Sequence, residues 1–256
     1  MEFDMKILLN ISYLGSAYCG YQVQKNGVSI QGKLNEAAEA LFGYECDVVG
    51  CSRTDRGVHA DMFCATLTKK GESDIDSTIP EDAIPMALNR FLPSDIAVRA
   101  ASYVDSEFHP RYDVKQKEYV YKIFDSRLPD PFLSGRVWHY PRAISDEDVA
   151  RMDMAAKEFV GRYDFSSFMA SGSSVSDTVR TIFSASVRRE GNLVVFSVCG
   201  DGFLYNMVRI MTGTLVAVAE GKIEVSDIKN IILSCDRRLA GATAPAEGLY
   251  LHKVVY

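Results

Sequence analysis

Alternating apolar and polar positions mark the strands of the first part of the chain. Residues 6–13 alternate with a period of two, which is typical of a half-buried strand. Residues 44–51 and 60–68 have strand character and flank a polar turn, and residues 95–104 form a last strand-like segment. We therefore predict a group of strands within residues 1–105.

Apolar residues at helical spacing lie between these strands. Ser29 can cap a helix that Gly43 is placed to end. Pro80 can open another helix, whose apolar stripe consists of Ile84, Leu88 and Phe91. The resulting order, β-α-β-β-α-β, is that of a ferredoxin-like unit.

The second part of the chain repeats this order with one helix added. The expected strands are 119–123, 179–189, 193–199 and 249–255, with a hairpin turn at Gly191 and Asn192. The expected helices are one capped by Ser145 and ended by Gly161, one at 204–219, and a short one from Ser226.

The two similar parts predict an α+β fold. We expect two ferredoxin-like halves joined into one extended, mainly antiparallel sheet, with helices on one side and a cleft between the halves. The expected domains are 1–105 and 106–256. No flexible linker is evident near residues 105–115, so we expect the halves to pack rigidly.

Composition narrows the classes of function. The chain is 47% hydrophobic and 24% charged, which disfavours disorder. No stretch is long enough to span a bilayer, and Glu2 and Asp4 stand where a signal peptide would be basic, so we expect a cytoplasmic protein without a membrane partner. The six cysteines form no C-x-x-C pair, and no phosphate-binding glycine motif occurs, so we expect no metal and no cofactor.

The net charge of −6 by itself disfavours a nucleic-acid partner, because phosphate neutralisation needs Lys and Arg. Net charge is an average, however, and an acidic protein can hold a locally basic cleft. The charge therefore leaves an RNA partner open.

One turn concentrates candidate chemistry, because Asp55 stands there between Arg53 and Arg56. Turns select Asp and Gly for conformational reasons, so such a segment is most often only structural. The surrounding positive charge is the unusual feature, since it keeps a carboxylate ionised and nucleophilic.

The segment 53–60, Arg-Thr-Asp-Arg-Gly-Val-His-Ala, resembles a turn of the TruA family of tRNA pseudouridine synthases. Further segments resemble blocks of that family in family order: 20–24, 108–111, 117–121, 164–168, 203–209 and 244–251. The resemblance spans essentially the whole chain. It implies an intramolecular isomerase that breaks the N1–C1′ bond of a uridine and rejoins the base through C5, which requires no cofactor.

The resemblance also implies roles for individual residues. Asp55 is the nucleophile, Tyr119 lies against the target uracil, and Arg209 pairs with the aspartate. The resemblance also implies that Arg53 binds the substrate. The implied substrate is tRNA, by default at positions 38, 39 and 40 on the 3′ side of the anticodon stem-loop, and the implied assembly is a homodimer. Whether Asp55 attacks C1′ or removes the C2′ proton stays open.

Three alternatives remain at this point. The best-known bacterial members carry alanine where this chain has Arg56, so the enzyme could act at other tRNA positions or on other RNAs. A non-catalytic RNA-binding protein of the same fold is a second alternative. A thiol or serine hydrolase that uses Cys51 or Ser52 with His59 is a third, although no orienting acid or oxyanion element accompanies those residues.

Overall fold

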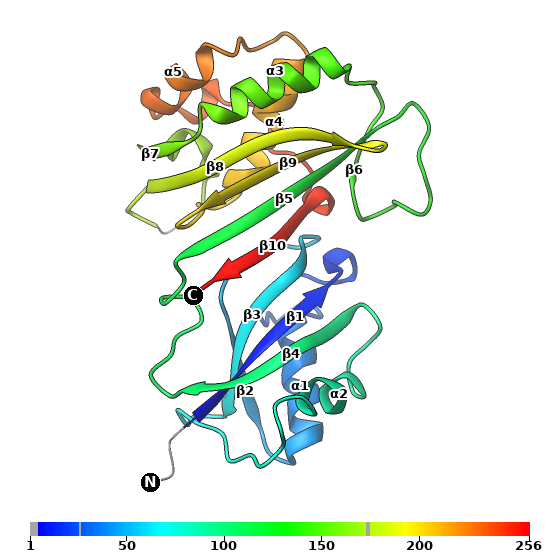
Figure 1. Ribbon diagram of the computed structural model, residues 1–256, viewed down its shortest axis with the longest axis vertical. Helices are drawn as coiled ribbons and strands as arrows, with labels where there is room; N and C mark the ends of the chain where they lie inside the picture. Colours follow the sequence, from blue (N-terminus) through cyan, green and yellow to red (C-terminus); the bar gives the residue numbers. More distant parts are fainter. Residues whose placement is uncertain (1–4, 26, 173–174) are drawn as a thin grey trace. The chain divides into compact units, whose positions relative to one another are not determined.

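A computed structural model describes residues 5–25, 27–172 and 175–256. The chain divides into two compact units (Figure 1). Unit 1 consists of Met1–Lys115 and Leu251–Tyr256, and unit 2 consists of Gln116–Tyr250. The expected domains, 1–105 and 106–256, stay a prediction, because a cluster of contacts does not establish an independently folding domain.

The strands of unit 1 form an antiparallel sheet. They are β1 (Met5–Tyr13), β2 (Cys46–Gly50), β3 (His59–Lys69), β4 (Ile96–Asp105) and the last part of β10 (Leu249–Val255). The order is β4-β1-β3-β10, with β2 paired to β3. On β1 the buried side chains alternate with half-buried ones, as predicted, and Ile7, Leu9 and Ile11 face the core.

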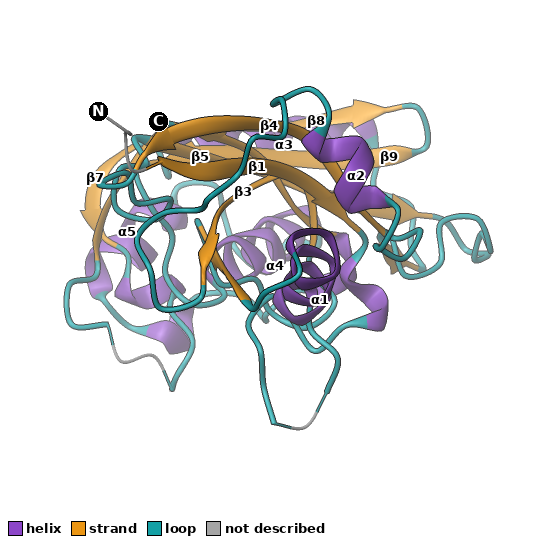
Figure 2. Ribbon diagram, turned by 90° about the horizontal axis from the view of Figure 1, so that it is seen from below, coloured by secondary structure: helices purple, strands orange, loops and turns teal. Residues whose placement is uncertain are grey.

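Two α-helices belong to unit 1, α1 (Ile30–Phe42) and α2 (Ile84–Asn89). The hydroxyl oxygen of Ser29 accepts a hydrogen bond from the Gly32 backbone at 3.1 Å, and Gly43 ends α1 at φ 77°, both as predicted. α2 begins at Ile84 and not directly after Pro80, because residues 81–83 form turns. In Figure 2, α1 lies on one face of the strands of its unit.

The strands of unit 2 are β5 (Gln116–Asp125), β6 (Trp138–Tyr140), β7 (Gly161–Asp164), β8 (Val179–Glu190) and β9 (Leu193–Gly200). The order is β5-β9-β8-β7, and β6 pairs with β5 in the parallel sense. The hydrophobic pattern of the sequence does not predict β6 and β7, which are only three and four residues long. Gly161 opens β7 at φ 129° and does not end the preceding helix, which finishes at Lys157.

The helices of unit 2 are α3 (Asp146–Lys157), α4 (Met207–Ala219) and α5 (Asp227–Ser234). Ser145 and Asp148 form the predicted capping box of α3. α4 begins three residues after the predicted start at 204, because Asn206 adopts a left-handed conformation at φ 60°. The predicted α+β class and the mainly antiparallel pairing are confirmed.

Short 3-10 turns complete the described elements. They are η1 (Gly15–Ala17), η2 (Ser166–Phe168), η3 (Arg237–Leu239) and η4 (Ala246–Gly248). η1 belongs to unit 1 and the others to unit 2.

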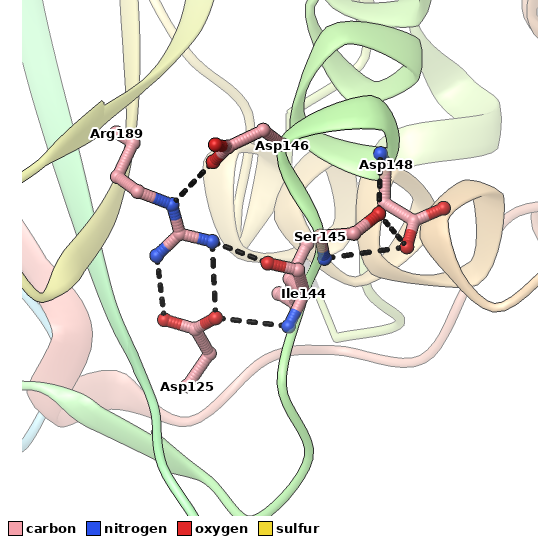
Figure 3. Close-up of polar contacts among 6 residues, drawn as sticks. All are labelled: Asp125, Ile144, Ser145, Asp146, Asp148 and Arg189. Carbon is pink, nitrogen blue, oxygen red and sulfur yellow. Dashed lines mark hydrogen bonds and ion pairs between the residues drawn. The ribbon is translucent and has the colours of Figure 1, made fainter.

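A charged network fixes one end of the sheet of unit 2 (Figure 3). The Arg189 guanidinium, at the end of β8, donates two parallel hydrogen bonds to the Asp125 carboxylate at 3.0 and 3.1 Å. Arg189 also contacts Asp146 at 3.0 Å and the Ile144 carbonyl. The Asp125 side chain is only 6% exposed, and it accepts a further bond from the Ile144 backbone at 2.9 Å. The network therefore joins the ends of β5 and β8 to the start of α3.

Candidate active site

The turn between β2 and β3 carries Asp55 in unit 1. The Val58 backbone donates a hydrogen bond to the Asp55 carbonyl at 3.1 Å, and Gly57 takes φ 83°, a conformation that favours glycine. Asp55 is half-buried, whereas Arg53 and Arg56 on either side of it are exposed. The structure therefore places Asp55 and the two arginines that flank it in one turn, with the arginine side chains more exposed than the carboxylate.

The loop before α1 packs its backbone against this turn. A Cβ at Gly15 would lie 2.0 Å from the Val58 carbonyl oxygen, and a Cβ at Gly20 would lie 2.8 Å from the Thr54 carbonyl oxygen. The Tyr21 backbone donates to that same Thr54 carbonyl at 3.1 Å. Backbone approaches of this kind leave the turn little freedom, so the position of Asp55 is fixed by glycines distant in sequence.

Thr54 and His59 anchor the turn from inside. The hydroxyl groups of Tyr13 and Thr54 share a hydrogen bond of 2.8 Å. His59 is fully buried, and its Nδ1 accepts a hydrogen bond from the Gly15 backbone at 2.9 Å. An imidazole that accepts at Nδ1 from a backbone N–H is held in one tautomer and serves as a structural partner.

The same geometry weakens the hydrolase alternative. Cys51 has no exposed surface, and neither has His59. A nucleophile and its base must reach a substrate, and the imidazole nitrogen that could accept a proton is already engaged by Gly15. Burial also raises the pKa of two neighbouring thiols, Cys46 to about 11 and Cys64 to about 12, which keeps both in the unreactive protonated form.

Tyr119 and Arg209, the other two predicted site residues, lie in unit 2. Tyr119 is in β5 opposite Val198 of β9, is 7% exposed, and makes an edge contact with Phe203 at 5.0 Å between ring centroids. Tyr121, two residues further along β5, is fully buried, and burial raises its pKa. Tyr121 therefore belongs to the core.

Arg209 is half-buried on the first turn of α4. Its Nε donates to the Ala244 carbonyl at 2.7 Å, and its Nη1 donates to the Asn206 side chain at 2.7 Å. Two of the three guanidinium nitrogens are thus tied to neutral oxygens of its own unit. These contacts fix the plane of the guanidinium, which a flexible lysine could not reproduce.

Residues 241–245 emerge as a positioning segment whose role pattern analysis did not assign. A Cβ at Gly213 of α4 would lie 1.8 Å from the Ala242 carbonyl oxygen. The segment also accepts the hydrogen bond of Arg209 at Ala244 and that of the Tyr121 hydroxyl at the Pro245 carbonyl, at 2.6 Å. It therefore joins α4 to β5. A glycine inside an apolar helix is the available sequence signal, since it marks a close backbone approach.

Among the described residues, no group of three or more His, Cys, Asp or Glu side chains is placed to hold a metal ion. No helix in the described part of the chain has the length and apolar character needed to cross a membrane.

The described residues form an α+β fold in which the turn between β2 and β3 carries a carboxylate, Asp55, flanked in the sequence by two arginines. The model of a family described as tRNA pseudouridine synthase matches residues 10–113 and 155–256 of this chain. Three bacterial relatives named tRNA pseudouridine synthase A each align with 98% of this chain and 99% of their own length. They are 45% identical in Acetivibrio thermocellus, 40% in Caldicellulosiruptor saccharolyticus and 42% in Ruminiclostridium cellulolyticum.

The chain therefore belongs to the tRNA pseudouridine synthase family, an isomerase family. Among solved structures, a chain of a Cbf5-Nop10-Gar1 complex aligns with 99% of this chain and 58% of that chain. The identity is 13% and the TM-score 0.35.

Proposed function

We propose that this enzyme converts uridine to pseudouridine in tRNA, at positions 38, 39 and 40 on the 3′ side of the anticodon stem-loop, and that Asp55 is its nucleophile. The observation that carries the proposal is the Asp55 turn, a carboxylate between Arg53 and Arg56 in a backbone fixed by Gly15 and Gly20. Family membership supplies the reaction, and the resemblance to the TruA family supplies the positions.

The reaction requires the N1–C1′ bond to break and a C5–C1′ bond to form. The proton on C5 is lost, N1 gains a proton, and no electrons are exchanged with a third molecule. A carboxylate suits this chemistry because it can bond to, or stabilise, an electron-poor C1′. Removal of the C2′ proton by the same carboxylate is the second route, and both routes need Asp55 in the same place.

The remaining site residues follow the same proposal. Tyr119 holds the flipped uracil against its ring, since every base presents a flat π-face. Arg209 orients the Asp55 carboxylate and keeps it ionised, because the planar guanidinium can donate two parallel hydrogen bonds to a carboxylate. Arg53 contributes positive charge for the RNA backbone. The proposed assembly is a homodimer in the cytoplasm, which rests on the family resemblance.

The test is tritium release from tRNA labelled at uridine C5, measured with enzyme in excess. Asp55→Asn keeps the size of the side chain but removes the charge and the nucleophilic oxygen, so no release is expected while RNA binding persists. Asp55→Glu should be nearly as inactive, because displacement of the carboxylate by about 1 Å costs on the order of 100-fold. Asp61→Asn is the matched control, since Asp61 is an exposed carboxylate of β3 in the same unit.

Substantial release by Asp55→Asn under single-turnover conditions would make Asp55 a structural turn residue and remove the basis of the mechanism. The position is tested separately, by mapping pseudouridine in tRNA from cells with and without the gene. If the pseudouridine content at positions 38, 39 and 40 did not change, the proposed reaction would still hold, but the target uridine would lie at another position.

A further inference from the structure

A pocket of about 200 Å³ opens within unit 1, and its lining includes Arg53 of the Asp55 turn. The other lining residues are His109, Arg111 and Tyr112 of one turn, together with Tyr21, Gln22, Gln31, Val49 and Gly50. Two guanidinium groups, two tyrosines, one imidazole and two side-chain amides are thus among the groups that line one space. None of Arg111, His109, Tyr112 and Gln22 has a role in the reaction proposed above.

The Tyr21 side of the pocket is rigid. The Tyr21 ring stacks on Phe63 at 4.3 Å between centroids, and a Cβ at Gly50 would lie 2.5 Å from the Tyr21 ring. Burial raises the pKa of the Tyr21 hydroxyl well above its ordinary value, so this wall carries no negative charge. It therefore does not repel an anion.

Residues 109–112, which include three lining residues, form a turn that is held by hydrogen bonds within itself. The His109 Nδ1 accepts hydrogen bonds from the backbone of Arg111 at 3.1 Å and of Tyr112 at 3.4 Å. The Asp113 carboxylate accepts from the His109 backbone at 2.8 Å. Since Nδ1 is an acceptor, the proton of the neutral imidazole is on Nε2, which makes that nitrogen a donor.

Contacts with distant parts of unit 1 hold this turn in place. The Tyr256 hydroxyl donates to the Pro110 carbonyl at 2.8 Å, and its ring packs edge-on against Phe108 at 4.9 Å. Lys6 of β1 donates to the Phe108 carbonyl at 3.1 Å. The turn is therefore pre-organised by the last residue of the chain and by the first strand, which lowers the entropy cost of binding a ligand there.

The character of the lining selects an anionic, flat ligand. Among the described residues, neither Arg53 nor Arg111 forms an ion pair with a carboxylate, so both charges remain for a ligand. Guanidinium groups bind phosphate oxygens in a fixed fork geometry. The Tyr112 side chain is 77% exposed and lies 4.2 Å from the His109 ring, at an angle of 30°. An exposed ring backed by a second ring is a stacking surface for a nucleobase.

We propose that this pocket binds one nucleotide of the substrate RNA other than the target uridine, with its phosphate between Arg53 and Arg111 and its base on Tyr112. The inference rests on the proposed function for the identity of the ligand. Because Arg53 and Asp55 share one turn, a phosphate held there fixes the RNA backbone relative to the nucleophile. Arg111 and Tyr112 are positioning residues for the RNA and take no part in bond breaking.

The test measures equilibrium binding of an unmodified tRNA transcript and of its anticodon hairpin, over a range of salt. Arg111→Gln should weaken binding at least tenfold and lower the slope of log Kd against log salt by roughly 0.7 to 0.9, as expected for one lost phosphate contact. Tyr112→Ala should weaken binding by roughly 5- to 150-fold, the range for one base stacked on an aromatic ring, without changing the slope. Arg99→Ala is the matched control, because Arg99 is an exposed arginine of β4 in the same unit.

Turnover separates positioning from chemistry. Arg111→Gln and Tyr112→Ala should raise KM while kcat under saturating tRNA changes by less than the loss in affinity. Tyr112→Phe keeps the ring and should restore binding. Circular dichroism and Tm, compared with those of Arg99→Ala, exclude an effect on folding.

Two outcomes overturn the proposal without touching the function. One is a Kd of Arg111→Gln and Tyr112→Ala equal to that of Arg99→Ala, in an enzyme that still forms pseudouridine. The other is tight binding of uridine monophosphate, blocked by Arg111→Gln, with no effect of that substitution on the hairpin, which would assign the pocket to a free nucleotide. Conversely, the unmodified enzyme could release no tritium while its RNA binding still depends on Arg111. That result would support the proposed nucleotide pocket and contradict the proposed activity.

Discussion

The backbone N–H of Gly15 donates to the buried Nδ1 of His59 at 2.9 Å. This hydrogen bond joins the loop that precedes α1 to the first residue of β3, directly after the turn that carries Asp55. The loop and the turn therefore behave as one rigid piece. A substitution that disturbs this contact should therefore lower both the thermal stability of the protein and its rate of turnover.

Gly15→Ala should slow turnover and lower stability. An added Cβ would lie 2.0 Å from the Val58 carbonyl oxygen, so the turn must move. Overpacking of this kind costs about 1 to 3 kcal/mol, and a displacement of about 1 Å at the carboxylate costs on the order of 100-fold in rate. Thermal unfolding and tritium release on the same preparation measure the two effects.

Gly191→Ala is the control for that substitution. Gly191 has φ 57° in the β8–β9 hairpin, and nothing lies within 4 Å of a Cβ built there. It should cost about 1 to 2 kcal/mol of stability through backbone strain alone and leave turnover unchanged. A rate for Gly15→Ala equal to that of Gly191→Ala would show that the loop does not position the nucleophile.

Alkylation of the native enzyme should leave its activity intact. Cys235 is exposed, whereas Cys46, Cys51 and Cys64 are buried. The thiolate is the reactive form, so Cys46 and Cys64 stay slow until the pH approaches their raised pKa values of about 11 and 12. Mass spectrometry after iodoacetamide treatment near pH 8 should find Cys235 modified first. Loss of turnover in step with modification of Cys51 would revive the thiol hydrolase.

Local capping and turn chemistry made most helices and strands predictable. Ser29 and Gly43 bound α1, and Ser145 opens α3, because each satisfies backbone groups that a helix end leaves unpaired. Where prediction went wrong, a single backbone conformation decided the outcome. Asn206 at φ 60° delays the start of α4, and Gly161 at φ 129° opens a strand where a helix end was expected. Such conformations depend on tertiary contacts that no local pattern records.

The sequence predicts which types of residue make up the candidate site, but it does not predict the contacts that hold them in place. The turn containing Asp55 stands out in the sequence by its charges. Its anchoring by Gly15 and Gly20 does not, because those glycines act through backbone approaches across many residues. Residues 241–245 show the same limit, since the close contact between Gly213 and Ala242 joins segments remote in sequence.

Arg189→Ala should destabilise the protein far more than Asp146→Ala, although both remove a member of one network (Figure 3). Arg189→Ala leaves the Asp125 carboxylate, 6% exposed, without its cation, and a buried charge left unpaired costs about 3 to 5 kcal/mol. The Asp146 side chain is 89% exposed, so its loss costs about 1 kcal/mol or less. Urea unfolding of the two variants measures the difference, and equal midpoints would contradict the argument.

Tyr119→Leu should slow turnover much more than Tyr119→Phe, because stacking on the uracil needs the ring. Tyr121→Phe is the structural control in the same strand. It removes the hydroxyl that donates to the Pro245 carbonyl at 2.6 Å, and it should cost about 1 kcal/mol of stability with turnover retained. Equal losses of tritium release in Tyr119→Phe and Tyr119→Leu would assign the contribution to the hydroxyl group in place of the ring.

Arg209→Ala should leave the fold intact and greatly reduce tritium release. The helix around Arg209 is held by apolar packing of Met207, Val208 and Ile210, so the guanidinium is not needed for α4 to form. Arg209→Lys keeps the charge but loses the fork that the Ala244 carbonyl and the Asn206 side chain align, so it should also be slow.

Asn206→Gly separates the charge of Arg209 from its alignment. Glycine adopts φ 60° readily, so α4 keeps its start, while the 2.7 Å contact to the Arg209 Nη1 is lost. If alignment matters, the rate of Asn206→Gly falls between those of the unmodified enzyme and Arg209→Lys, with Tm nearly unchanged. The positive charge survives in Asn206→Gly and in Arg209→Lys but not in Arg209→Ala. Comparison of the three rates therefore shows how much the charge of Arg209 contributes to turnover and how much its alignment contributes. Near-normal turnover by a folded Arg209→Ala would remove Arg209 from the mechanism and leave Asp55 to be oriented by the residues of its own turn.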